Sequence, residues 1–252
     1  MVARGAIDHP LLTSRAFFPR ATRVADPFVV RARGAELHCW RAAPHAAAPT
    51  VIHFHGNGEV VSDYLPGFAD TLIGLGVNLV LAEYRGYGGS TGSPSLGALL
   101  DDAEAVLAAT GVPAERVIAY GRSVGSYAAV HLAGRHHLAG LILESGIADP
   151  MERILLRVTP EELGVSGAAL AAEVAERLDP EPKLARHVAP ILVLHAIRDS
   201  MIDATHAVRL ASWAASEDKE LVLFPRGDHN DVFAANQPAY LRALREFLTR
   251  AE

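Results

Sequence analysis

Hydrophobic residues gather along the chain in short runs, separated by longer segments in which they recur at helical spacing. Runs of about four to eight apolar residues, bounded by polar and turn residues, are typical of buried β-strands. Eight stretches meet this description: 28–32, 36–42, 50–55, 77–84, 116–121, 138–144, 190–196 and 220–225. The pattern therefore predicts an eight-stranded sheet.

The clearest helical pattern lies in residues 95–110. Its apolar positions follow the i, i+3, i+4 spacing of one helix face: Leu96, Leu99, Leu100, Ala103, Val106 and Leu107. Asp101, Asp102 and Glu104 fall on the opposite face. This segment is therefore predicted to be an amphipathic helix.

The order of the elements indicates the fold class. No helix-length segment separates the first two strands, which predicts an antiparallel start to the sheet. Strands and helices alternate from there on, which favours a mostly parallel sheet with helices on both faces. The 252 residues suffice for one α/β domain with a substantial core, so we expect 1–252 to form a single domain.

One region interrupts the alternation. Residues 146–189 separate two predicted strands and contain more chain than one crossover helix needs. We expect a small helical cap over the carboxyl ends of the strands. The apolar stretch 154–158 in this cap could line a pocket for an acyl group, or could only pack the cap onto the sheet.

Composition and charge narrow the possible partners. The net charge of −6 provides no basic face, which argues against nucleic acid and anionic membrane surfaces. No export signal and no apolar run of membrane-spanning length is visible, so we expect a cytoplasmic protein without a stable membrane anchor. The single cysteine, Cys39, excludes an internal disulfide and is expected to be a buried, inert thiol.

A candidate nucleophile lies in the stretch AYGRSVGSYAA, residues 119–129, which holds a G-x-S-x-G motif around Ser123. The motif follows a predicted strand and precedes a helix-compatible segment. Such a turn lifts the serine above the sheet and needs glycine at 121 and 125, where a Cβ would collide. The amide of Val124, at the start of the helix, is then available to a developing oxyanion.

A serine hydroxyl needs an oriented base to become a nucleophile. Of the twelve histidines, His229 follows the last predicted strand, and Asp199 follows the preceding strand. The chain order Ser, Asp, His is the order in which a serine on such a strand-to-helix turn is followed by its acid and its base. Asp203 is an alternative acid that we interpret as a helix N-cap, and Asp228 is interpreted as a surface residue.

A second oxyanion donor is expected in the loop after the third strand, where glycines at 56 and 58 allow close backbone approach. The amide of Asn57 is the candidate, and His55 is interpreted as a structural histidine rather than a second base. Three other histidines, at 131, 136 and 137, are expected to face solvent and show no metal-ligand spacing. No metal or organic cofactor is expected.

Together, the stretches HGNGE, EYRGYGGSTGSPS, YGRSVG, LILESG and GDHND resemble the α/β-hydrolase superfamily, within it the serine aminopeptidase-like and ABHD-type serine hydrolases. The resemblance extends from about residue 28 onward. It implies an α/β-hydrolase fold with Ser123 as nucleophile, Asp199 as acid, His229 as base, and the amides of Asn57 and Val124 as oxyanion hole. It also implies that Arg85 anchors a structural loop. The N-terminal cysteine cluster of the membrane-bound depalmitoylases in this group is not present, which argues against a membrane-anchored depalmitoylase.

These features predict a serine hydrolase that cleaves a small carboxylic ester or thioester through an acyl-enzyme. Two alternatives stay open: an aminopeptidase or amidase, for which Glu144 or Asp149 could bind the substrate amine, and a non-catalytic binding module. Arg122, beside the nucleophile, could bind an anionic substrate group or pair with an internal acid. The acyl length, the leaving group and the oligomeric state do not follow from the sequence.

Overall fold

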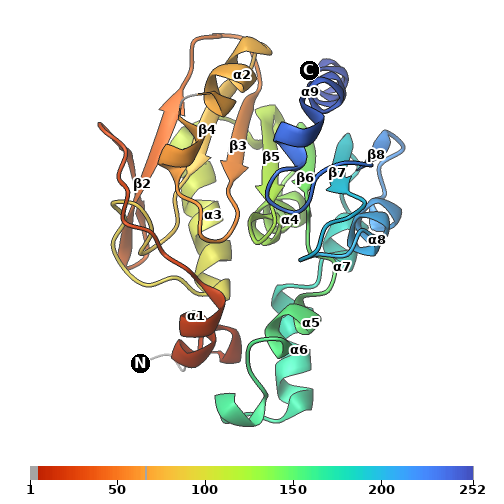
Figure 1. Cartoon of the computed structure of the whole chain (residues 1–252). Helices are drawn as coiled ribbons and strands as arrows, with labels where there is room; N and C mark the ends of the chain where they lie inside the picture. Colours follow the sequence, from red (N-terminus) through yellow and green to blue (C-terminus); the bar gives the residue numbers. More distant parts are fainter. Residues whose placement is uncertain (1–4, 66, 252) are drawn as a thin grey trace.

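The computed structural model describes residues 5–65 and 67–251 and places the predicted strands in one sheet, in the order β1-β2-β4-β3-β5-β6-β7-β8 (Figure 1). Only β2 runs against its neighbours: it pairs antiparallel with β1 and β4, and all later pairs are parallel. The α/β-hydrolase fold is thereby confirmed. The strands are β1 (Phe28–Ala32), β2 (Ala35–Ala42), β3 (Thr50–Phe54), β4 (Asn78–Ala82), β5 (Val117–Arg122), β6 (Gly140–Glu144), β7 (Ile191–Ala196) and β8 (Lys219–Phe224).

Helices cover both faces of the sheet. On one face lie α3 (Leu96–Thr110), α4 (Gly125–Arg135) and α8 (Thr205–Trp213); on the other lie α2 (Phe68–Gly74) and α9 (Val232–Arg250). None of the helices among the described residues is long and apolar enough to cross a membrane. Short 3₁₀ helices complete this part of the fold: η1 (Ala6–Asp8), η2 (Val61–Tyr64) and η3 (Ala114–Arg116).

Burial on both sides explains why the central strands are continuous apolar runs. Val51 packs into the core under α2 and α9, whereas the next residue, Ile52, packs into the core under α3 and α4. The same alternation occurs at Ile118 and Ala119 in β5. Because successive strand residues point to opposite faces, a strand covered on both faces needs apolar residues at every position.

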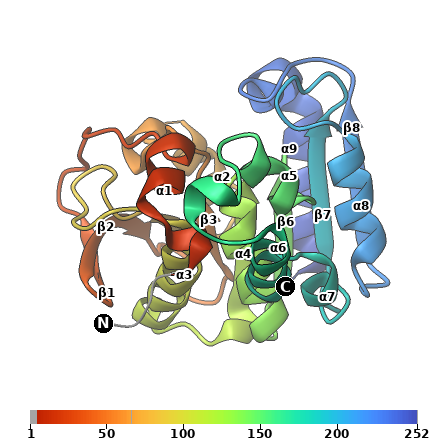
Figure 2. The same ribbon diagram turned by 90° about the horizontal axis from the view of Figure 1, so that it is seen from below.

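The segment between β6 and β7 contains α5 (Pro150–Leu155), η4 (Glu161–Leu163), α6 (Gly167–Arg177) and α7 (Glu181–Leu184). Beside it lies α1 (Pro10–Ala16), a helix that the sequence pattern did not predict (Figure 2). Arg15 at the end of α1 binds Glu162 at 2.9 Å, and the amide of Ala6 donates to Glu173 at 2.7 Å. In Figure 1, α1, α5 and α6 lie together beyond one end of the sheet. The function of 146–189 as a cap stays a prediction.

The polar face predicted for 95–110 is wrong at one position. Asp102 is buried, and its two carboxylate oxygens accept hydrogen bonds at 2.7 and 2.6 Å from Nε and Nη2 of Arg85. This bidentate pair anchors the loop after β4 to α3, as the family resemblance implied for Arg85. The helical spacing could not predict that the carboxylate of Asp102 points inward, because its partner, Arg85, lies on another element.

The predicted exposure of two histidines is also wrong. His131 and His136 are half-buried, and their Nε2 atoms lie 3.1 and 2.7 Å from the two carboxylate oxygens of Glu104. Only His137 of this group is exposed. Glu104 thus joins α3 to the end of α4, and these histidines have a structural role far from the candidate nucleophile.

Cys39 in β2 is fully buried, and burial raises its pKa to about 12. A thiol must be accessible and ionised to react. We therefore expect no reaction between Cys39 and dithiobis-nitrobenzoate in the native protein, and one released thiolate equivalent per chain after unfolding in urea. Release of the chromophore from native protein at the rate of a free thiol would contradict this burial.

Candidate active site

The turn between β5 and α4 holds Ser123 in an unusual backbone conformation, with φ at 51°. This left-handed region is costly for a residue with a Cβ and recurs at functional sites. The flanking glycines make the turn possible: a Cβ at Gly121 would lie 2.6 Å from the carbonyl oxygen of Gly125, and a Cβ at Gly125 would collide with the carbonyl of Phe54. The strand and the helix therefore cross closely enough to present the hydroxyl at the end of the sheet.

Three loops bring Ser123, His229 and Asp199 together, although they are far apart in the sequence. His229 Nε2 lies 3.0 Å from Ser123 Oγ, and His229 Nδ1 lies 2.8 Å from Asp199 Oδ2. All three residues are buried. The loops follow β5, β7 and β8, three parallel strands whose carboxyl ends share one edge of the sheet. The geometry is that of a hydroxyl in contact with an oriented imidazole.

Asp199 is held as a carboxylate. Its second oxygen, Asp199 Oδ1, accepts the amide N–H groups of Met201 at 2.9 Å and Ile202 at 2.8 Å. Burial alone would raise the pKa of Asp199, but hydrogen bonds from His229 and the Ile202 amide outweigh it, so the pKa lies below its usual value. An ionised Asp199 orients the ring of His229 and keeps the proton on Nδ1.

The two alternative acids lie elsewhere. Asp203 is exposed, and its Oδ1 accepts the amide of Thr205 at 2.9 Å; the N-cap of α8 itself is Ala204, one residue later than predicted. Asp228 is exposed as predicted, but it also joins two loops, because its carboxylate accepts the amide and the hydroxyl of Ser200 at 2.6 and 2.8 Å. Neither carboxylate contacts the imidazole of His229.

Arg122 is buried behind the site and is an internal partner of acids. Its guanidinium binds the carboxylates of Glu59 and Glu144 and donates to the carbonyl of His229 at 2.8 Å. Burial would lower the pKa of Arg122, but the two carboxylates outweigh it and raise the pKa above its usual value. The arginine is therefore a fixed cation that ties the loop of His229 to the sheet, and it does not line the pocket in front of Ser123.

Glu144, a candidate ligand for a substrate amine, is enclosed by its own partners. It is buried at the end of β6, with one oxygen 3.2 Å from Arg122 Nε. The other oxygen accepts the hydroxyls of Tyr120 at 2.6 Å and Tyr240 at 2.5 Å. Asp149 is occupied as well, because it caps α5 through the amide of Glu152 at 2.9 Å. Neither acid faces the pocket.

The residues of the two predicted oxyanion donors line the same pocket as Ser123. Val124 occupies the N-cap of α4, and Asn57 lies in the loop after β3. Neither amide donates a backbone hydrogen bond within residues 5–65 and 67–251. Two uncommitted N–H groups beside a serine hydroxyl can stabilise negative charge on a bound carbonyl oxygen.

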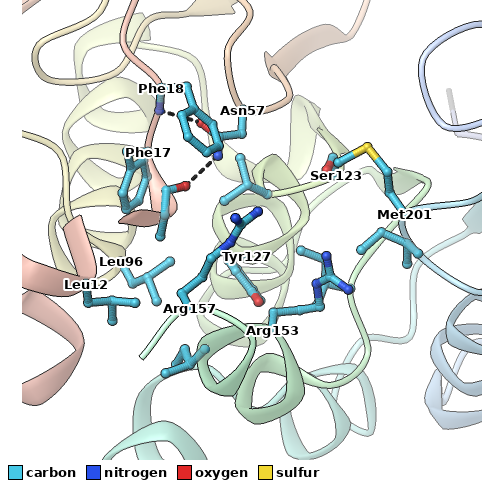
Figure 3. Close-up of a pocket in the computed structure, with 15 residues that line it drawn as sticks. Leu12, Phe17, Phe18, Asn57, Leu96, Ser123, Tyr127, Arg153, Arg157 and Met201 are labelled. Atoms are coloured by element: carbon cyan, nitrogen blue, oxygen red, sulfur yellow. Dashed lines mark hydrogen bonds between the residues drawn. The ribbon is translucent and has the colours of Figure 1, made fainter. Parts of the chain in front are cut away.

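The side chain of Asn57 has a second role that the sequence did not reveal. Its amide group donates to the carbonyl of Ala16 at 2.5 Å, and its oxygen accepts the amide of Phe18 at 3.0 Å (Figure 3). Tyr87 donates to the same oxygen at 2.7 Å. The side chain of Asn57 thus joins the end of α1 and the residues after it to the loop after β3, in which Asn57 itself lies.

A pocket of about 130 Å³ opens in front of Ser123. Its walls come from α1 and the following residues, from α3 and α4, and from α5, and most of them are apolar (Figure 3). From the stretch 154–158, Ile154 and Arg157 line it, whereas Leu155 and Leu156 are exposed. The other lining residues are Leu12, Ala16, Phe17, Phe18, Asn57, Leu96, Ser123, Val124, Tyr127, Ile147, Arg153, Met201 and Ile202.

His55 has a structural role, as predicted. It is buried, with Nε2 2.8 Å from Glu83 and Nδ1 2.8 Å from the carbonyl of Gly56. Burial would lower the pKa of His55, but the hydrogen bond to Glu83 outweighs it and the pKa is raised. An imidazole with both nitrogens turned to acceptors cannot act as a base. Among the described residues, no group of three or more His, Cys, Asp or Glu side chains could hold a metal ion.

Comparison with known proteins finds related chains over most of this length. The family model of serine aminopeptidase S33 (Hydrolase_4) matches residues 45–184. Human alpha/beta hydrolase domain-containing protein 17B is 30% identical over 257 aligned residues, covering 95% of this chain and 81% of that protein. An esterase from Pyrococcus furiosus has a similar structure at 15% identity, with a TM-score of 0.71 over 92% of this chain and 98% of its own. A monoacylglycerol lipase from Paleococcus ferrophilus gives 18% identity and a TM-score of 0.66, over 86% of this chain and all of its own.

Proposed function

Since this chain belongs to the serine aminopeptidase S33 family of the α/β-hydrolase superfamily, we propose that it cleaves carboxylic ester or thioester bonds through an acyl-enzyme on Ser123. The observation that carries the proposal is the contact of 3.0 Å between Ser123 Oγ and His229 Nε2, with Asp199 at 2.8 Å from the other ring nitrogen. A serine that only began a helix would need neither the imidazole nor the buried carboxylate.

The reaction begins when Ser123 Oγ attacks the substrate carbonyl carbon and His229 Nε2 takes the hydroxyl proton. Asp199 stabilises the imidazolium that forms and holds it in place. The tetrahedral intermediate collapses as His229 gives the proton to the leaving alcohol or thiol, which departs and leaves an acyl-serine. Water then attacks the acyl-serine with His229 again as base, and the acid is released.

The negative charge of each tetrahedral intermediate rests on the carbonyl oxygen between the amides of Asn57 and Val124. Such preorganised donors stabilise the transition state more than the substrate, because the charge exists only there. The left-handed turn at Ser123 places the Val124 amide beside the nucleophile. The bonds of the Asn57 side chain to Ala16 and Phe18 hold the other donor in place.

Esters and thioesters are favoured over peptides because the pocket offers an apolar wall and no carboxylate. An aminopeptidase needs an acid near Ser123 for the free amine, and both candidates are engaged elsewhere: Glu144 with Arg122, and Asp149 with the first turn of α5. Two of the structurally similar proteins are named an esterase and a monoacylglycerol lipase, which agrees with this substrate class. A binding module without catalysis is disfavoured because Ser123, His229 and Asp199 form an unbroken chain of contacts.

The test is intact-mass analysis after treatment with a fluorophosphonate. We expect one adduct per chain in the wild type and none in Ser123→Ala, since only an activated serine attacks the reagent. Ser212→Ala is the control, because Ser212 is an exposed serine of α8, outside the pocket, that should leave the adduct unchanged. A folded wild type that takes up no adduct and hydrolyses no p-nitrophenyl ester would overturn the proposal in favour of the binding module.

A further inference from the structure

Two guanidinium groups lie in the mostly apolar pocket in front of Ser123. Arg153 belongs to α5, and Arg157 lies just after that helix. They are the only charged residues among those that line the pocket. Figure 3 shows both side chains extending from the α5 side toward the part of the pocket that holds Ser123 and Asn57.

Neither arginine has a counter-charge. Within residues 5–65 and 67–251, no ion pair and no side-chain hydrogen bond is formed by Arg153 or Arg157. Acids of the same region are already paired with other groups: Glu152 with His206 at 3.3 Å, Asp149 with Arg209 at 3.6 Å, and Glu162 with Arg15 at 2.9 Å. The two free cations contrast with Arg122, which has two carboxylates although it lies close to the same site.

The fold holds one of these cations in position. The guanidinium carbon of Arg157 lies 5.7 Å from the ring centroid of Phe18, within the range of a cation–π contact. Phe18 is itself fixed by the hydrogen bond from its amide to Asn57, and the carbonyl of Arg157 accepts from Arg15 at 3.0 Å. Arg153 is half-buried beside it. Arg157 is more exposed, but both side chains line the pocket.

We propose that Arg153 and Arg157 bind an anionic group, a carboxylate or a phosphate, on the ester or thioester that Ser123 cleaves. This inference rests on the proposed function and adds a substrate class to it. The planar guanidinium forms paired hydrogen bonds with such anions. Arg153 is half-buried without a partner and has lost part of its hydration, which a bound anion would replace. The net charge of −6 repels anions from the molecule as a whole, so a local pair of cations is needed to attract one.

The anion can lie at the far end of the acyl group or on the leaving group, and matched pairs of substrates separate these cases. For the acyl side, the pair is the p-nitrophenyl monoester of adipic acid and p-nitrophenyl hexanoate, which differ in the terminal carboxylate. For the leaving group, the pair is butyrylglycerol phosphate and monobutyrin. The enzyme variants are the wild type, Arg153→Gln/Arg157→Gln, and the control Arg242→Gln/Arg245→Gln, which removes two exposed arginines from α9.

The expected result is that kcat/KM of Arg153→Gln/Arg157→Gln falls about 10- to 100-fold for the anionic member of one pair and stays within about twofold for its neutral partner. The control variant should match the wild type on every substrate. A fall with the adipate monoester assigns the anion to the acyl group, and a fall with butyrylglycerol phosphate assigns it to the leaving group.

Failure of this inference is distinct from failure of the proposed function. The proposed function stands if the wild type hydrolyses the neutral esters and Ser123→Ala does not. If the arginine variant then keeps the wild-type ratio of anionic to neutral rates in both pairs, only the anion subsite is overturned. If the wild type hydrolyses none of the esters, the proposed function fails. Calorimetric titration of Ser123→Ala with adipate and with glycerol phosphate then decides the subsite. Binding that Arg153→Gln/Arg157→Gln abolishes supports it, and no binding, or binding that these substitutions leave unchanged, overturns it.

Discussion

Replacing Asp199 by asparagine is expected to lower kcat for ester hydrolysis about 10⁴-fold while the chain stays folded. The two residues have the same shape, so packing is preserved and the change is confined to one hydrogen-bonding group. The loss of kcat follows from the direction in which the side-chain amide of the introduced asparagine must point. It is the expected result for a residue that sets the proton position on a catalytic imidazole.

The structure fixes that direction. Oδ1 of Asp199 accepts two backbone amides, from Met201 and Ile202, at 2.9 and 2.8 Å. In Asp199→Asn the carbonyl oxygen must keep this position, because the NH₂ group cannot accept from either amide. The NH₂ group therefore faces His229 Nδ1, which becomes an acceptor, and the ring proton moves to Nε2. That nitrogen then cannot take the proton of Ser123.

Asp203→Asn is the matched control, because Asp203 is the alternative acid in the same loop and contacts Thr205 rather than His229. Its kcat should lie within about twofold of the wild type. The measurements are kcat with p-nitrophenyl butyrate and the midpoint of thermal unfolding for all three proteins. The assignment would be refuted if Asp203→Asn lost as much activity as predicted for Asp199→Asn while the latter stayed active.

The eight strands and the contacts among Ser123, Asp199 and His229 could be anticipated because the signals for them are local. Each strand is an apolar run between turn residues, and a strand buried on both faces cannot be mistaken for an amphipathic one. Each of the three residues follows a predicted strand directly. Since the carboxyl ends of parallel strands meet at one edge, position in the chain nearly determines position in space.

The walls of the pocket could not be anticipated, because they depend on contacts between distant segments. Residues 10–18 carry no motif, and α1 acquires its place through the pair of Arg15 with Glu162 and the bonds of Asn57. The inward turn of Asp102 likewise depends on Arg85. Whether a polar residue on a helix is buried can be predicted only when its hydrogen-bonding partner on another element is known.

Arg122 is the residue whose role the sequence left open between a substrate ligand and an internal ion pair, and its removal should have the largest effect on stability. We expect Arg122→Met to lower the free energy of unfolding by about 3–5 kcal/mol, the range for breaking a buried ion pair by removing one partner. Glu144 is buried and would lose the cation that lies beside it. Arg245→Met, on the exposed face of α9, should change the same quantity by less than about 0.5 kcal/mol.

A double-mutant cycle separates this ion pair from the simple loss of packing. Met fills much of the volume of the arginine stem, so the penalty should come from the unpaired carboxylate of Glu144. Arg122→Met/Glu144→Gln should therefore recover about 1–3 kcal/mol relative to the sum of the single changes, as measured by urea unfolding. An Arg122→Met variant as stable as the wild type would show that neither Glu144 nor Glu59 holds the guanidinium. Arg122 would then be free to meet a ligand, and the sole assignment of a substrate anion to Arg153 and Arg157 would no longer hold.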